Sequence, residues 1–342
     1  SNIILYHATK YKPNIDLFCT FFEGAPKEYN HDYDIACKVS NYYGLKIIKT
    51  NITKKDYINK FYDSFSLIEE PNRNIGNPGY YLNYINQSKL GFRSILTGDG
   101  GDEIFVGYPW YRKGRMRELI YSNKLFSKFI KWPEINNYYE NYARYDSLER
   151  NKKFFFNLSS KIKSEIIELS KMNFDNYFKN SFFENHKNNW NIMKLILDQH
   201  NWLSSEVLIR ADKLSMRESL EIRSPFCDHD LRTKILDEID NSNFKSKINK
   251  SQIRSIYKDK LPEYIINEKK KFGWRCPREW INDPELKKQI IDIMPLKNSD
   301  FIDWKLIKNC LIKNEISLLD RSMAPILSLV ILNDVIFYFN IK

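Results

Sequence analysis

TGDGGDEIFVGY, at residues 97–108, is the segment from which the rest of this chain can be interpreted. It follows an apolar run at residues 92–96 that predicts a short buried strand, and the residues from about Asp102 onward predict a helix. Three glycines in four positions allow the backbone to approach a ligand closely, and free N–H groups at a helix N-terminus favour negative charge. The segment predicts a ligand-binding loop, with an ordinary Asp/Gly turn and helix-capping acids as the alternative.

The charges in this loop argue against one familiar phosphate site. A Walker loop places Lys and Ser/Thr directly after its glycines, where they meet phosphate. Here the carboxylates Asp99, Asp102 and Glu103 stand in that place. Because carboxylates repel phosphate, a phosphate ligand would need Mg²⁺ between them, or contact with only part of the loop.

The composition is that of a globular protein with a modest basic excess. The chain has 342 residues, enough for a sizeable core and two domains, with 42% hydrophobic and 28% charged residues. The net charge of +11 comes from 54 basic and 43 acidic residues, but the lysines are spread along the chain. This dispersion disfavours a nucleic acid partner, which would call for a basic cluster.

The cysteines and the apolar segments predict a cytoplasmic protein. The five cysteines are widely separated and show no zinc-site spacing, which favours a reducing compartment. No apolar run is as long as a membrane span, and no signal peptide precedes the first predicted helix. The most apolar segment, residues 324–339, contains Asn333 and Asp334 and predicts a buried helix. We expect no membrane partner.

Strands and helices alternate in the first third of the chain. The sequence predicts helices at residues 3–10, 32–43, 54–65 and from Pro78 to about residue 90, and strands at residues 15–22, 45–49 and 92–96. Such alternation predicts an α/β fold with a doubly wound parallel sheet, whose ligands bind at the carboxyl ends of the strands. The loop at residues 97–108 follows such an end.

The remainder of the chain is predicted to be helical. We expect an α/β nucleotide-binding core at residues 1–115, a helical insertion at residues 116–190, and a large helical C-terminal part at residues 191–342 that completes the active site. No strand precedes the first helix, although a strand–helix–strand unit should begin with one. We therefore expect the sequence to be a fragment that lacks its first strand and loop.

Two further segments have unusual charge patterns. Residues 208–228, LIRADKLSMRESLEIRSPFCD, alternate basic, acidic and small residues. The second segment is basic: it contains residues 250–254, KSQIR, and residues 269–273, KKKFG, and it ends at Gly273. Taken alone, the first segment is more typical of a solvated helix with ion pairs four residues apart, and the second is more typical of a solvated helix end.

Together these segments resemble the C-terminal synthetase domain of the asparagine synthetase family. The family pattern S-G-[D/E]-G-[G/A/S]-D-E-x-F-x-G-Y is met at residues 97–108, with Thr97 in place of Ser. The pattern L-x-R-x-D-x-x-x-M-x-x-S-L-E-x-R-x-P-F-x-D is met without a gap at residues 208–228. K-x-x-[L/I]-R and the lysine-rich segment ending in Phe-Gly follow in order. The resemblance covers nearly the whole chain.

The resemblance implies a fold of the adenine nucleotide α-hydrolase, or ATP pyrophosphatase, type and a ligase with ATP and Mg²⁺ as cofactors. A carboxylate, aspartate in the family, attacks the α-phosphate of ATP to form an acyl-adenylate and pyrophosphate, and ammonia then displaces AMP. The implied partners are a small-molecule carboxylate and an ammonia donor. An upstream glutaminase domain or subunit and a homodimer are further expectations.

The resemblance also implies roles for residues of the loop. Asp102 corresponds to a Mg²⁺ ligand. Thr97, Gly98 and Gly100 correspond to positions that bind the nucleotide. Asp99 falls where many members have the acid that assists the amine step, here one methylene shorter than Glu.

Two lysines and Ser1 complete the implied site. Lys250 would contact pyrophosphate, and Lys269 would stabilise negative charge on the intermediate, with Lys270 as the alternative because the segment is one residue shorter than in many members. The family's S-G-G-x-D-S pyrophosphate loop is missing, except that Ser1 aligns with its last residue. The alternative is that Ser1 is unrelated to that loop.

Three alternatives remain open from the sequence. The same chemistry could act on another substrate, as in relatives that close β-lactams or the macrolactam of lasso peptides. The chain could be a catalytically inactive nucleotide-binding or regulatory module. An ATP pyrophosphatase acting on tRNA would fit the charge, but it predicts basic residues clustered near the site.

Overall fold

The computed structural model describes residues 1–70, 72, 74–108, 111, 192, 195–196, 198–239, 250–268, 274–297, 302–318 and 323–338. Within these residues the chain is mostly helical, and its strands pair in parallel. The predicted helical insertion at residues 116–190 lies outside the described residues, as do Lys269 and Lys270.

The first parallel pair is formed by β1 (Leu17–Phe22) and β2 (Ile47–Ile52), which pair over their whole length. The 3₁₀ helix η1 (Lys27–Asn30) and α2 (His31–Tyr43) connect them, and α2 packs on β1. The helix ends at Gly44, whose φ of 63° is the left-handed conformation expected of a glycine in that position. This strand–helix–strand unit confirms the predicted alternation.

The second parallel pair is formed by β3 (Ser94–Leu96) and β4 (Glu221–Arg223). Parallel pairing agrees with the predicted α/β class. The described residues, however, form two separate two-stranded sheets and do not show one doubly wound sheet. β4 lies in a region that we predicted to be helical. A three-residue strand gives no periodic signal of its own, and its partner lies far away in the sequence.

The described residues before β3 also form the helices α1 (Asn2–Tyr11), α3 (Lys54–Asn59), α4 (Phe61–Ser66) and α5 (Asn77–Lys89), and α5 packs on both β1 and β2. The single helix predicted at residues 54–65 is divided in two, because Lys60 leaves the helical conformation at φ −103° and ψ 4°. Thr53 begins α3 with a capping box, in which its hydroxyl accepts from the Asp56 N–H and the Asp56 carboxylate accepts from the Thr53 N–H.

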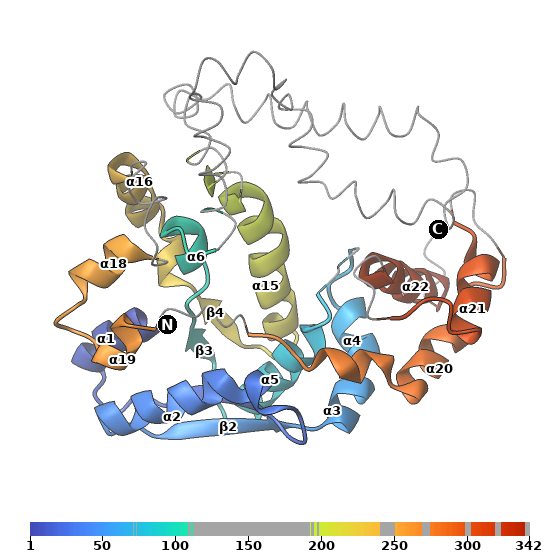
Figure 1. Ribbon diagram of the computed structural model, residues 1–342, viewed down its shortest axis with the longest axis horizontal. Coiled ribbons are helices and arrows are strands. Elements are labelled where there is room, and N and C mark those ends of the chain that lie inside the picture. The colour runs from blue at the N-terminus through green and yellow to red at the C-terminus, as the bar shows by residue number, and fades with distance from the viewer. Residues whose placement is uncertain are drawn as a thin grey trace, which may run out of the picture.

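The part of the chain described from residue 192 onward is mostly helical, with β4 as the exception. Its elements are the π-helix η3 (Asp198–Leu208), α15 (Ile209–Met216), the 3₁₀ helices η4 (Pro225–Cys227) and η5 (Arg278–Asn282), α16 (His229–Glu238), α18 (Ser251–Ile256), α19 (Glu263–Ile266), α20 (Pro284–Asp292), α21 (Trp304–Ile312) and α22 (Met323–Tyr338). Figure 1 shows α16, α18 and α19 on the same side as the chain start, and α20, α21 and α22 on the opposite side.

The largest hydrophobic cluster joins the two ends of the sequence. Phe61 and Phe65 of α4 stack with ring centroids 4.7 Å apart and are almost fully buried. They pack with residues of α20, α21 and α22, including Ile307 and Leu327. The buried helix predicted near the C-terminus is therefore confirmed as α22. No helix in the described ranges combines the length and apolar character that crossing a membrane requires.

Candidate active site

The glycines of the loop permit contacts that a side chain would block. The loop follows β3 and leads into α6 (Gly101–Ile104), a single turn rather than the longer helix we predicted. Gly100 has a φ of 84°, and a Cβ there would lie 2.7 Å from Cys227 Sγ. A Cβ on Gly98 would lie 2.7 Å from the Ser1 nitrogen. The loop is thus packed between the start of α1 and the segment that follows β4.

Asp102 and Lys250 form an ion pair beside this loop. Lys250 Nζ lies 3.1 Å from Asp102 Oδ1, and both side chains remain partly exposed, at 31% and 25%. Lys250 is the N-cap of α18 and has a φ of 54°, an uncommon conformation for a residue with a side chain. A Cβ on Gly107 would overlap Asp102 Oδ1 and lie 2.7 Å from Lys250 Cε. The absence of a side chain at Gly107 therefore leaves space for the Asp102–Lys250 ion pair.

The Asp99 carboxylate contacts Thr97 within the first signature segment, residues 97–108, and Thr97 in turn contacts Ser224 of the second signature segment, residues 208–228. Thr97 Oγ1 donates to Asp99 Oδ2 at 2.8 Å, and Thr97 Oγ1 lies 3.0 Å from Ser224 Oγ. The Thr97 N–H also donates to the Arg223 carbonyl at 2.9 Å, which extends the β3–β4 pairing. We did not predict Ser224 as a site residue. Its only sequence signal is its place just before Pro225 in the second signature.

Glu103, the third carboxylate of the loop, is directed into the protein interior. It is 2% exposed and accepts a 2.6 Å hydrogen bond from the Tyr108 hydroxyl, which in turn accepts from Trp202 Nε1 at 3.3 Å. Gln199 Nε2 donates to the Glu103 carbonyl at 3.0 Å. Burial, and then the charge of Glu103, raise the pKa of Tyr108 far above its ordinary value. Tyr108 therefore stabilises the loop through its hydrogen bond to Glu103.

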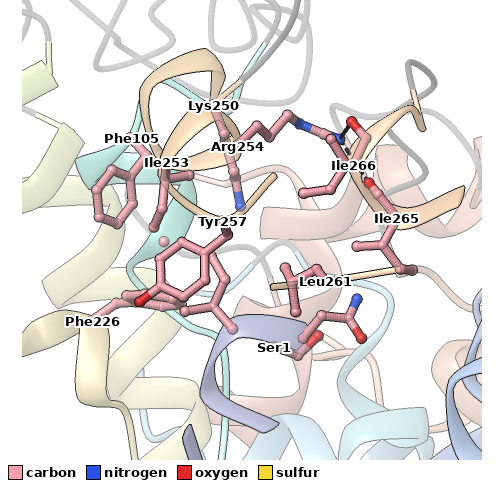
Figure 2. Close-up of a pocket in the computed structure, with 13 residues that line it drawn as sticks. Ser1, Phe105, Phe226, Lys250, Ile253, Arg254, Tyr257, Leu261, Ile265 and Ile266 are labelled. Carbon is pink, nitrogen blue, oxygen red and sulfur yellow. Dashed lines mark hydrogen bonds between the residues drawn. The ribbon is translucent and has the colours of Figure 1, made fainter. Parts of the chain in front are cut away.

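A pocket of about 120 Å³ lies next to the ion pair. It is lined by the start of α1, by Gly101 of α6, and by residues of α18 and α19. Its walls are apolar, with Phe226 and Tyr257 among them, and its cations are Lys250 and Arg254. Figure 2 shows the Lys250 amine directed toward the interior of this pocket. An anion in the pocket would meet Lys250.

The lysine-rich segment is flanked by two anchored ends. Before it, Arg254 Nη1 donates to the Ile265 and Ile266 carbonyls at 2.8 and 2.6 Å, as Figure 2 shows. After it, the Trp274 indole N–H donates to Thr20 Oγ1 at 2.5 Å. Residues 269–273 themselves lie outside the described residues, so the structure does not test the predicted roles of the lysines there.

The donor set fits a Mg²⁺ ion that binds together with phosphate. Within residues that the structure describes, no three His, Cys, Asp or Glu side chains gather into a metal site of their own. Asp102 supplies one carboxylate beside Lys250 and the pocket. Mg²⁺ is usually bound by one or two carboxylates, water and substrate phosphate oxygens. Asp102 therefore fits the part of a single protein ligand.

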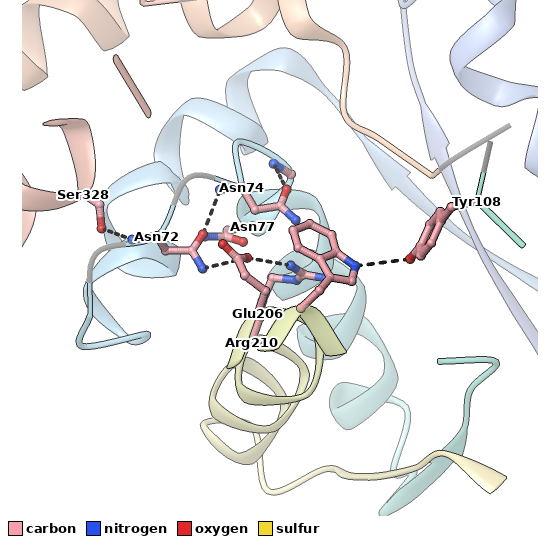
Figure 3. Close-up of polar contacts among 9 residues, drawn as sticks. Asn72, Asn74, Asn77, Tyr108, Glu206, Arg210 and Ser328 are labelled. Carbon is pink, nitrogen blue, oxygen red and sulfur yellow. Dashed lines mark hydrogen bonds and ion pairs between the residues drawn. The ribbon is translucent and has the colours of Figure 1, made fainter. Parts of the chain in front are cut away.

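The helix α15 of the second signature segment is partly buried, and Arg210 is one of its buried residues. Arg210 is 5% exposed, stacks 4.7 Å from the Tyr80 ring centroid, and pairs with Glu206 at 3.6 Å. Figure 3 shows Asn72 beside this pair; its side chain donates to Glu206 at 3.4 Å, and its backbone N–H donates to Ser328 of α22 at 2.8 Å. The alternative of a wholly solvated helix is therefore wrong for α15.

Seven of the predicted site residues belong to one neighbourhood in the structure: Ser1, Thr97, Gly98, Asp99, Gly100, Asp102 and Lys250. They come from the start of α1, the loop between β3 and α6, and the N-cap of α18. Lys269 and its alternative Lys270 cannot be placed with them.

Comparison with known proteins gives evidence on the family that is independent of this geometry. A family model described as asparagine synthase matches residues 1–326. Asparagine synthetase (glutamine-hydrolyzing) 1 of Bacillus subtilis (strain 168) is 23% identical over 331 residues, which cover 88% of this chain and 48% of that protein. Asparagine synthetase (glutamine-hydrolyzing) 2 of Lotus japonicus is 28% identical over 117 residues, covering 33% of this chain and 19% of that protein.

These matches also give the extent of the likeness. The chain spans about half the length of the Bacillus subtilis relative, at 48%. The family match, in contrast, covers all but the last residues of the chain and includes both signature segments. The chain belongs to the asparagine synthase family.

Proposed function

We propose that this chain is the synthetase part of an ATP-dependent, AMP-forming ligase that converts aspartate to asparagine. The observation that supports this most strongly is the Asp102–Lys250 pair beside the glycine loop and the pocket. A carboxylate for a metal ion and a lysine for phosphate, next to a loop without bulky side chains, suit the release of pyrophosphate from ATP. Membership of the family supports the same reaction class.

In the first half-reaction, a substrate carboxylate oxygen bonds to the α-phosphorus of ATP and pyrophosphate leaves. Asp102 would hold Mg²⁺, which when bound offsets the negative charge of the phosphates. Lys250 would bind the departing pyrophosphate in the pocket that its amine faces. Thr97, Gly98 and Gly100 would contact the nucleotide along the loop, with Ser1 at the edge of the same space.

In the second half-reaction, ammonia bonds to the acyl carbon and AMP leaves. The nitrogen must lose a proton as the tetrahedral intermediate forms, and Asp99 would accept it. Lys269, or Lys270 in its place, would stabilise the negative charge on the intermediate oxygen.

The setting of the reaction is part of the proposal. Both relatives named above are described as glutamine-hydrolysing, so we assign the ammonia supply to a glutaminase domain or subunit upstream of this chain. We propose a cytoplasmic homodimer, with residues 1–115 as the nucleotide-binding core, residues 116–190 as an insertion, and residues 191–342 completing the site.

A carboxylate panel tests the proposal on the full-length protein. AMP and pyrophosphate release would be measured with ATP, Mg²⁺ and ammonia, adding aspartate or other carboxylates one at a time. The proposal expects AMP and pyrophosphate to be released in equal amounts when aspartate is added, together with formation of asparagine. Release that depends on a β-amino acid or a peptide carboxylate instead would assign a cyclase. Absence of release with every carboxylate, in a protein that still binds ATP, would assign a nucleotide-binding module.

A further inference from the structure

We infer that Ser224 is a positioning residue that orients the Asp99 carboxylate through the Thr97 hydroxyl. The inference rests on the proposed function, in which Asp99 accepts a proton from the attacking nitrogen. Ser224 Oγ lies 3.0 Å from Thr97 Oγ1, and Thr97 Oγ1 lies 2.8 Å from Asp99 Oδ2. Ser224 comes from the second signature segment and the other two residues from the first.

Proton counting fixes the direction of both hydrogen bonds. An ionised carboxylate only accepts, so the Thr97 hydroxyl donates its single proton to Asp99. The Thr97 oxygen then has no proton left for Ser224, and the 3.0 Å contact requires the Ser224 hydroxyl to donate to Thr97. The three groups form a chain of donors that ends at Asp99, and each bond in such a chain strengthens the next.

The backbone around Ser224 holds this chain in place. The Thr97 N–H donates to the Arg223 carbonyl at 2.9 Å, directly before Ser224. The Cys227 N–H donates to the Ser224 carbonyl at 2.8 Å, at the start of η4. Cys227 Sγ also lies 3.7 Å from the Asp99 carbonyl. Contacts of Arg223 before Ser224 and of Cys227 after it therefore connect this segment to the Asp99 loop. They fix the Ser224 hydroxyl relative to the Asp99 carboxylate.

The orientation has a consequence for the second half-reaction. Asp99 Oδ2 is engaged by Thr97, so a fixed carboxylate presents Oδ1 to the attacking nitrogen. A misplaced proton acceptor slows proton transfer without altering ATP binding. Ser224 should therefore affect the ammonia-dependent step far more than the adenylation step.

The test compares Ser224→Ala with Ser224→Thr, which keeps the hydroxyl. In the full-length protein, aspartate-dependent ATP–pyrophosphate exchange reports the first half-reaction, and asparagine formation from ammonia reports both. We expect S224A to keep exchange within about twofold and to lower asparagine formation about three- to tenfold, the loss of one neutral hydrogen bond. S224T should restore asparagine formation. Equal loss in both assays, or loss in neither, would overturn the inference.

A double-mutant cycle separates action through Thr97 from a direct effect. Thr97→Val removes the intermediate hydroxyl while keeping the shape of the side chain. If Ser224 acts through Thr97, adding S224A to T97V should cause no further loss of asparagine formation. If the loss in the double variant is the product of the losses in S224A and T97V, Ser224 does not act through Thr97.

Ser66→Ala serves as the matched control, because Ser66 is also a half-buried serine with one side-chain hydrogen bond, 2.9 Å to the Asp63 carbonyl.

A crystallographic comparison keeps the inference testable even if aspartate is not the substrate. Crystal structures of the wild type, S224A and S224T would give the separation of Thr97 Oγ1 and Asp99 Oδ2. We expect it to stay near 2.8 Å in the wild type and S224T. In S224A the Thr97 hydroxyl should rotate and the separation should exceed about 3.5 Å. An unchanged separation in S224A would refute the positioning role, whereas failure of aspartate to support exchange would refute only the proposed function.

Discussion

The two signature segments match the family's patterns equally clearly in sequence, but they fold in very different ways. Residues 97–108 directly follow β3 and form a glycine turn and one helical turn within twelve residues. Residues 208–228 pass from a π-helix through α15 into β4 and a 3₁₀ turn, and β4 exists only because it pairs with β3. The first segment is thus determined locally, and the second is determined by its partners.

The largest expected effect comes from breaking the first segment at Gly107. In Gly107→Ala the new Cβ would overlap Asp102 Oδ1 and approach Lys250 Cε to 2.7 Å, so the ion pair must separate. We expect ATP–pyrophosphate exchange to fall about 10²-fold. Gly24→Ala is the control, because a Cβ there meets nothing within 4 Å although φ is 73°. It should cost about 1 kcal/mol of stability and leave exchange unchanged. Exchange at the wild-type rate in G107A would mean that adenylation does not depend on the Asp102–Lys250 ion pair.

The second segment should be sensitive at its buried ion pair. Arg210 pairs with Glu206 where both side chains are largely buried, so Arg210→Met leaves a carboxylate behind and should lower the free energy of unfolding by about 3 kcal/mol. Arg223 pairs with Glu221 at 2.9 Å, but both side chains are more than half exposed, and Arg223→Met should cost less than about 1 kcal/mol. Urea denaturation of both variants gives the comparison. Equal losses would mean that partner contacts do not stabilise α15.

These two segments also show what could be predicted from sequence. The loop and the C-terminal glycine of α2 follow from residue types that act over a few positions, whereas the Asp102 and Lys250 positions are implied only by the resemblance to the family's patterns. β4 could not be predicted, because a three-residue strand has no periodicity and its partner is distant in sequence.

Other details escaped prediction for similar reasons. The break at Lys60 lies inside a helical pattern with no glycine or proline to mark it. Ser224 has no local signal, because its importance comes from a contact with Thr97, 127 positions away. The burial of Glu103 depends on Tyr108 and Gln199, and nothing in the loop sequence distinguishes this buried carboxylate from those of Asp99 and Asp102.

The smallest expected effect is a pH dependence of stability in η3, just before the second signature. Burial, and then the charge of Arg232, lower the pKa of His200 below its ordinary value. The folded state therefore favours neutral His200, and its contribution is complete above about pH 6.5 and lost as the pH falls through the lowered folded value. His200→Gln should reduce the loss of stability between pH 7.5 and 5.

Urea midpoints at the two pH values measure this effect. The variant should lose less stability on acidification than the wild type. His229 provides the control, because its side chain is 85% exposed. His229→Gln should leave the pH dependence as it is in the wild type. If H200Q and the wild type respond alike, His200 does not couple protonation to folding of this region.

The most direct test of the account is aspartate-dependent ATP–pyrophosphate exchange in the full-length protein with Asp102→Asn. The change keeps the shape of the side chain and removes the charge that faces Lys250 and that would hold Mg²⁺. The account predicts robust exchange in the wild type and a loss of about 10²-fold in D102N, with the thermal midpoint changed little. Exchange in D102N at the wild-type rate would contradict an adenylation site built on this loop.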